Sequence, residues 1–107
     1  MALLFRYQQD DGSEPFTKWL STLRDPIARA RILARLRQIE AGNFGDVAAV
    51  GEGVNELRIH VGAGYRVYFG QHGQAIVILL CGGDKRKQAV DIRRAQKYWT
   101  DWKARQS

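Results

Sequence analysis

Hydrophobic residues recur along this chain with two spacings, which divide it into a helical first half and a strand-rich second half. From Phe16 to Leu23 the apolar residues fall at i, i+3, i+4 and i+7, the spacing of one helix face. A second helical stretch begins after Asp25, and Gly42 is placed to end it. The pattern predicts two consecutive helices that form a hairpin, with Ser13 capping the first and Asp25 the second.

The spacing changes to alternation from Asp46 onward, which indicates a β-meander. Turns rich in glycine or glutamine separate its strands at residues 51–53, 62–64 and 71–74. Strands are expected at residues 2–8, 54–61, 64–69 and 74–81. The last of these is apolar on both faces, so we expect it in the interior of the sheet.

The final segment, residues 88–105, returns to helical spacing. Its apolar stripe consists of Ile92, Ala95, Trp99 and Trp102. The order of elements therefore predicts an α+β fold in one domain over residues 1–107, with a helical hairpin on one face of a mainly antiparallel, twisted sheet and a C-terminal helix. The tryptophans of this helix suit packing, and an aromatic contact with a partner is the alternative.

Alternation also predicts which polar side chains share a surface. If the apolar sides of the second and third strands face the helices, the opposite face carries Glu56, Arg58, His60, Arg66 and Tyr68. The buried strand then delivers Lys85, Arg86 and Lys87 beside that face. We therefore expect an open basic surface that suits phosphate, since guanidinium groups bind phosphate oxygens in a bidentate way and a tyrosine can stack on a base.

Composition narrows the class of protein. The chain carries a net charge of +6 and lacks an apolar run of the ~20 residues that a membrane helix needs, so we expect an anionic partner and no membrane. Cys81 is a lone cysteine, expected in the core, and a cytoplasmic location fits best. No Cys/His spacing indicates a zinc site. Nucleic acid and an acidic protein are both compatible with this charge.

The chain resembles the RelE/HigB family of bacterial toxins, within it the addiction-module killer proteins. The resemblance spans nearly the whole chain and is carried by the F-x-x-W-L motif at 16–20 and by residues 28–47, 56–60, 64–69 and 76–95. It implies a RelE-like β-α-α-β-β-β-β core, usually with a C-terminal helix. It also implies that the protein is a ribosome-dependent endoribonuclease that cuts mRNA. A cognate antitoxin, often a helix-turn-helix protein, would bind and neutralise it. DNA would be contacted only indirectly, through this antitoxin.

The resemblance assigns roles to residues of this chain. Arg58 and Arg66 would stabilise the charge on phosphate oxygens during attack by the ribose 2′-OH, without metal or cofactor. Lys85 is the first candidate for proton transfer, because neighbouring cations should lower its pKa, with Tyr68 and His60 behind it. Many family members have a double lysine after the buried strand, which here corresponds to Lys85 and Arg86. Gln88 matches a polar position that recurs in the family shortly after it. Where many relatives have histidine and phenylalanine, this chain has Cys81 and Gly83, which argues against a histidine-based mechanism.

The second helix is strongly basic, with no acidic residue from Pro26 to Gln38. This imbalance favours ribosomal RNA or an acidic antitoxin segment as its partner. The predicted RNA contacts are Arg31, Arg35, Lys87, Gln88 and His60.

Other interpretations remain open at this stage. Strand arginines often serve only to keep one face of a sheet solvated, and His60 alone suits a surface position. Glu56 can pair with Arg58, or with His60 as a ribonuclease acid–base pair. At the level of the whole protein, the alternatives are a non-nuclease toxin like ParE, which acts on DNA gyrase, and a basic RNA-binding module without catalysis.

Overall fold

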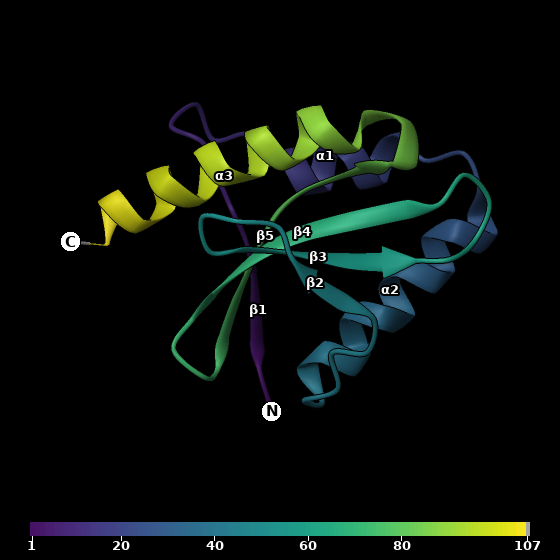
Figure 1. Cartoon of the computed structure of the whole chain (residues 1–107), viewed down its shortest axis with the longest axis horizontal. Coiled ribbons are helices and arrows are strands. Elements are labelled where there is room, and N and C mark those ends of the chain that lie inside the picture. Colours follow the sequence, from purple (N-terminus) through teal and green to yellow (C-terminus); the bar gives the residue numbers. More distant parts are fainter. Residues whose placement is uncertain (107) are drawn as a thin grey trace.

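The computed structural model describes residues 1–106, which form three α-helices, a short 3₁₀ helix and five strands. In chain order the elements are β1 (Leu3–Arg6), α1 (Pro15–Thr22), α2 (Pro26–Glu40), β2 (Val47–Ala49), β3 (Val54–Ile59), β4 (Tyr65–His72), β5 (Ile76–Asp84), η1 (Lys85–Lys87) and α3 (Gln88–Arg105). This order confirms the predicted α+β fold and the C-terminal helix (Figure 1).

The strands form one sheet in the order β1-β5-β4-β3-β2. β2 to β5 make an antiparallel meander, and β1 joins its far side in parallel with β5. The interior position predicted for the apolar strand is therefore confirmed. A bulge between Tyr68 and Phe69 of β4 shifts the register, so that Leu80 and Cys81 of β5 both pack in the same hydrophobic cluster.

Each face of the sheet carries its own hydrophobic core. Phe16 of α1 and Ile32 of α2 pack with β-strand residues such as Leu57 on the first face, as the hairpin prediction required. On the second face, Ala95 and Trp99 of α3 pack in a separate cluster. That cluster contains Tyr7, Val54, Tyr68, Ile78, Leu80 and Cys81.

The second core corrects the prediction of an open polar face. Helices α1 and α2 cover the first face of the sheet, so the apolar stripe of α3 can be buried only against the second face. We had expected that second face to be exposed to solvent. Glu56 and Tyr68 are consequently fully buried, and Arg58 and Arg66 lie where the cover of α3 ends. The basic surface is an edge beside α3 rather than a whole face of the sheet.

Helix ends follow the sequence in one case and depart from it in the other. Asp25 caps α2, its carboxylate accepting hydrogen bonds from the backbone N–H groups of Ile27 and Ala28, as predicted. The predicted cap at Ser13 is wrong, because α1 begins at Pro15, after Glu14, and the Ser13 hydroxyl donates to Asp11 instead. Asp11 and Ser13 therefore stabilise the turn that precedes α1.

Two tryptophans set the positions of the helices that carry them. The ring of Trp99 in α3 lies on Gly70, where a β-carbon would come within 2.3 Å of it, and Trp19 of α1 lies on Gly82 at the same distance. Both helices thus approach the sheet at positions where the strand has no side chain.

No helix in residues 1–106 combines the length and apolar character that crossing a membrane requires.

Candidate functional site

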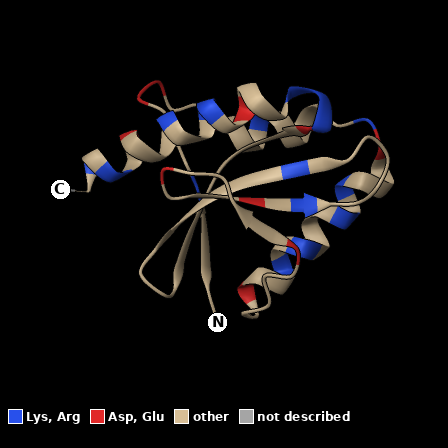
Figure 2. Cartoon of the chain, in the orientation of Figure 1, with Lys and Arg blue, Asp and Glu red and all other residues tan. Residues whose placement is uncertain are grey.

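Many of the lysine and arginine residues lie at one end of the molecule, and others follow α3 (Figure 2). Figure 2 shows the first group on α2, on η1 and on the neighbouring parts of β3 and β4. The side chains of β3 and β4 come together in this region through cross-strand pairing, with Arg58 opposite Arg66 and Glu56 opposite Tyr68. Like charges placed opposite each other destabilise a sheet, so an acidic group near the two arginines is needed to offset them.

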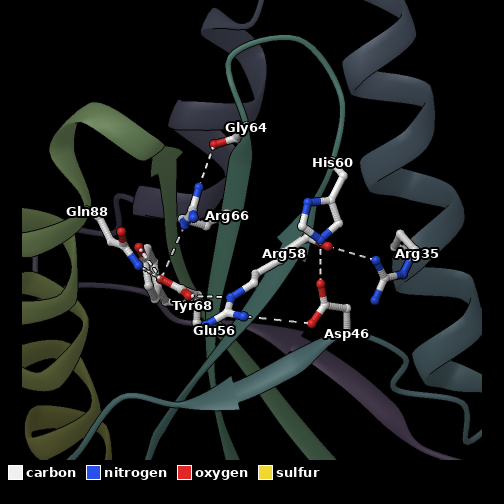
Figure 3. A network of polar contacts seen from close by, with 9 residues as sticks. All are labelled: Arg35, Asp46, Glu56, Arg58, His60, Gly64, Arg66, Tyr68 and Gln88. Carbon is white, nitrogen blue, oxygen red and sulfur yellow. Dashed lines mark hydrogen bonds and ion pairs between the residues drawn. The ribbon is translucent and has the colours of Figure 1, made fainter.

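Glu56 is that acidic group, and it lies fully buried at the centre of the network in Figure 3. One carboxylate oxygen accepts a hydrogen bond from Nε of Arg58 at 3.1 Å. The other accepts from the Tyr68 hydroxyl at 3.1 Å and from the Gln88 amide at 2.8 Å, with Nε of Arg66 at 3.5 Å. A buried carboxylate is tolerated only when it is paired and hydrogen-bonded in this way.

Arg58 joins Glu56 to a second carboxylate nearer the surface. Its Nη1 lies 4.0 Å from Asp46, whose other oxygen contacts Nε2 of His60. The contact with His60 holds the pKa of Asp46 below its usual value, so this carboxylate stays ionised. His60 thus pairs with Asp46 and not with Glu56, and the structure gives no acid–base pair between Glu56 and His60.

Arg66 and Lys85 both approach Gly64, in the turn between β3 and β4. Gly64 has a positive φ of 78°, and a β-carbon built on it would lie 3.5 Å from Nη1 of Arg66 and 3.7 Å from Cβ of Lys85. Nη1 of Arg66 donates to the carbonyl of Gly64 at 2.9 Å. Nη1 of Arg66 and Cβ of Lys85 thus lie near the same glycine, and the convergence of their charged groups on one substrate stays a prediction.

The three basic residues after β5 form η1 and are exposed. Asp84 caps this short helix by accepting from the backbone N–H of Arg86, and it also pairs with the Arg86 guanidinium at 3.1 Å. The side chain of Arg86 remains 83% exposed. Lys85, Arg86 and Lys87 are thus available to an anion, while Gln88, the first residue of α3, is committed to Glu56.

The position of Tyr68 contradicts its expected place on an exposed surface. Its ring is fully buried under α3, and burial together with the neighbouring Glu56 carboxylate raises the pKa of its hydroxyl above the usual range. A buried tyrosine that already donates to Glu56 can neither stack on a base nor act as a proton donor to solvent. We assign it to the core.

The two arginines selected on α2 differ in their surroundings. Arg31 is exposed, whereas Arg35 donates from Nη1 to the carbonyl of Arg58 at 2.8 Å and from Nη2 to that of Phe44 at 2.9 Å. Arg35 therefore ties α2 to β3 and to the loop before β2. The open basic side that we expected for α2 includes Arg31 but not Arg35.

This difference separates the effects of two charge reversals. We expect Arg31→Glu to leave the free energy of unfolding within about 0.5 kcal/mol of the parent. Arg35→Glu should lower it by about 1–3 kcal/mol, because two carbonyls lose their donor. Urea denaturation of both variants checks this, and equal destabilisation by the two would contradict the assignment. If α2 contacts RNA, as its charge predicts, Arg31→Glu should also reduce the salt dependence of that association.

Sequence reasoning missed the central position of Glu56 and any part for Asp46. It considered Glu56 as a partner of Arg58, and that pair is confirmed. The sequence did contain a signal for this position. Glu56 is the one acidic residue among the polar residues predicted for that face of the two strands, and the apolar stripe of α3 needs a face of the sheet to pack against. No group of three or more histidine, cysteine, aspartate or glutamate side chains in residues 1–106 forms a candidate metal site.

Comparison with known proteins places the chain in a family. The model of the phage-derived protein Gp49-like family (DUF891) matches residues 18–99, most of the chain, so the chain belongs to this family. An uncharacterized protein of Haemophilus influenzae is 49% identical over 81 residues, which cover 76% of this chain and 82% of that relative. The matched span contains α2, the meander, η1 and most of α3, and with them all the network residues of Figure 3.

Proposed function

We propose that this protein is the toxin of a type II toxin–antitoxin module and acts as a ribosome-dependent mRNA endoribonuclease. The observation that supports this best is the convergence of Arg58 and Arg66 on Glu56 beside the exposed lysines of η1. The Gp49-like match and the RelE/HigB resemblance fall on the same segment of the chain. A cognate antitoxin, of the helix-turn-helix kind, is the proposed neutralising partner.

The proposed reaction is a transesterification within the RNA chain. The ribose 2′-oxygen loses its proton and bonds to the adjacent phosphorus, and the bond from phosphorus to the 5′-oxygen breaks as that oxygen takes up a proton. The products are a 2′,3′-cyclic phosphate and a 5′-hydroxyl. Arg66 would stabilise the charge on the phosphorane oxygens, and Lys85 is the proposed proton carrier.

Arg58 is assigned a supporting part in this scheme. It is shared between Glu56 and Asp46, so its positive charge is already largely compensated before any phosphate arrives. Within residues 1–106, Arg66 has one carboxylate neighbour, at 3.5 Å, and its strand β4 lies between β3 and the strand β5 that leads into Lys85. We therefore propose Arg66 as the main phosphate ligand and Arg58 as a residue that positions Glu56.

The deciding experiment incubates the purified protein with a defined mRNA, alone and on programmed 70S ribosomes. We expect cuts only on ribosomes, with 2′,3′-cyclic phosphate ends, and their loss in Lys85→Ala. Arg93→Ala is the matched control, because Arg93 is an exposed basic residue on the outer side of α3. No cuts from a folded protein that still arrests growth would favour an action on gyrase. No cuts and no arrest would leave an RNA-binding module.

A further inference from the structure

β1 is an edge strand, because within residues 1–106 it pairs with β5 on one side and with no strand on the other. The backbone N–H groups of Leu3 and Tyr7 donate to carbonyls of β5 and of the residue before it. In a parallel ladder, alternate residues bond to the neighbouring strand, so the N–H and C=O groups of Leu4 and Arg6 point away from β5. These outward groups are able to pair with a further strand.

Two large apolar side chains of β1 are exposed beside this edge. Leu3 is 59% exposed and Phe5 is 52% exposed. Leu4 packs against the first core, so alternation places Leu3 and Phe5 on the second face of the sheet. Their neighbours on β5, Ile76 and Ile78, pack in the second core. The apolar surface of the second face therefore continues beyond the cover of α3, toward the end of the sheet where β1 begins (Figure 1).

This edge lacks the usual protection against pairing with another chain. Proteins that stay monomeric commonly place charged side chains, proline or a bulge on an edge strand. The first three residues of β1 are leucine, leucine and phenylalanine. Arg6 follows them, but its guanidinium turns toward α1 and lies 5.1 Å from the centre of the Phe16 ring. An exposed apolar edge of this kind is typical of an association surface.

We propose that the free edge of β1 binds the same edge of a second copy of this chain, as an antiparallel pair that joins the two sheets. With a twofold axis beside Leu4, each Leu4 exchanges its two outward backbone hydrogen bonds with Leu4 of the second copy. The same register places Leu3 of each copy opposite Phe5 of the other, so the exposed apolar side chains cover one another. This self-complementarity is what a twofold dimer requires, and it does not depend on the protein cleaving RNA.

The charges at the ends of the strand also fit a second copy. In this register Arg6 falls opposite Ala2 of the other copy, and the backbone N–H of Ala2 donates to the carbonyl of Glu40 at the end of α2. A cation thus approaches a carboxylate residue and a helix C-terminus at both ends of the paired strands. Each copy carries a net charge of +6, so the copies repel each other at long range. Higher salt should therefore strengthen the dimer, whereas it weakens RNA binding.

Sedimentation equilibrium of the purified full chain tests the association. Because a single pair of short strands buries little surface, we expect reversible dimers with a Kd on the order of 10–100 μM. Phe5→Glu should raise the Kd by more than about 10-fold, because the dimer would bury a carboxylate without a partner. Ile27→Glu is the matched control, since Ile27 is a large apolar residue of α2 that is 64% exposed, and it should leave the Kd unchanged. Circular dichroism establishes that both variants fold.

Disulfide crosslinking tests the register. A mixture of Leu3→Cys and Phe5→Cys proteins, oxidised with copper–phenanthroline, should form linked dimers faster than either protein alone, because the unlike positions face each other with their Cα atoms about 4.5 Å apart. Cys81 is buried and is common to all samples. The proposal is overturned if the parent is a monomer up to about 1 mM. It is equally overturned if Phe5→Glu and Ile27→Glu associate alike, or if the mixture crosslinks no faster than its components.

Discussion

Glu56→Ala should lower the free energy of unfolding by about 3–5 kcal/mol, the cost typical of removing one partner from a buried ion pair. The carboxylate is inaccessible to solvent and serves Arg58, Arg66, Tyr68 and Gln88 at once. Without it, two arginines face each other across β3 and β4, and the buried Tyr68 hydroxyl loses its acceptor. Urea denaturation followed by tryptophan fluorescence measures the change.

Two further variants show whether the effect comes from the network. Glu40→Ala removes an exposed carboxylate at the end of α2 and should change stability by no more than about 0.5 kcal/mol. Glu56→Gln keeps the shape but turns an N–H₂ group toward donors, so its stability should fall between those of the parent and Glu56→Ala. An alanine variant as stable as the parent would show that Glu56 does not hold the arginines.

The fold followed from the sequence because two spacings and a few turn signals were unambiguous. The apolar stripe of α2, the alternation of β3 and β4, and the glycines between them each indicated one element. The alternation does not indicate whether a face of the sheet is covered by a helix or exposed to solvent. Polar residues at alternate positions of a strand are equally compatible with solvent and with a hydrogen-bonded network beneath a helix. The second case holds here for Glu56 and Tyr68.

The end of β5 was the other point that sequence reasoning could not resolve. Gly82 and Gly83 suggested that the strand ends at Cys81, yet β5 continues through both to Asp84. Glycine is disfavoured in strands, but here a side chain at Gly82 would meet Trp19, and one at Gly83 would come within 1.9 Å of Asp91. The reason for both glycines lies in residues of α1 and α3, far away in the sequence.

This packing also bears on Cys81 and Gly83, where the chain departs from the pattern of the toxins that it resembles. Cys81 is buried beside the backbone of Asp91, and burial raises the pKa of its thiol to about 12, so it is no nucleophile at neutral pH. A side chain at position 83 would collide with the Asp91 carboxylate in the first turn of α3 and force that carboxylate to move. The same turn begins with Gln88, which donates to Glu56, so Gly83 and the arginine network both border the start of α3.

If the protein cleaves mRNA as proposed, Arg66→Ala should slow cleavage on the ribosome by about 10²–10³-fold, the usual cost of losing one donor to a developing oxyanion. The Arg66 side chain is 13% exposed, and its contacts within residues 1–106 use Nε and Nη1, so the proposal assigns Nη2 to the phosphate oxygen. Glu56 keeps its hydrogen bonds from Arg58, Tyr68 and Gln88 in this variant, so we expect the protein to stay folded.

Arg66→Lys separates charge from geometry at the same position. Lysine supplies a point charge but not a planar fork, so the cleavage rate should be restored only in part. Single-turnover cleavage on programmed ribosomes, with circular dichroism to establish folding, measures all three proteins. A folded Arg66→Ala protein that cuts at the parent rate would remove Arg66 from the reaction. The arginine network would then be a structural support of the sheet, with the chemistry left to Lys85 and its neighbours in η1.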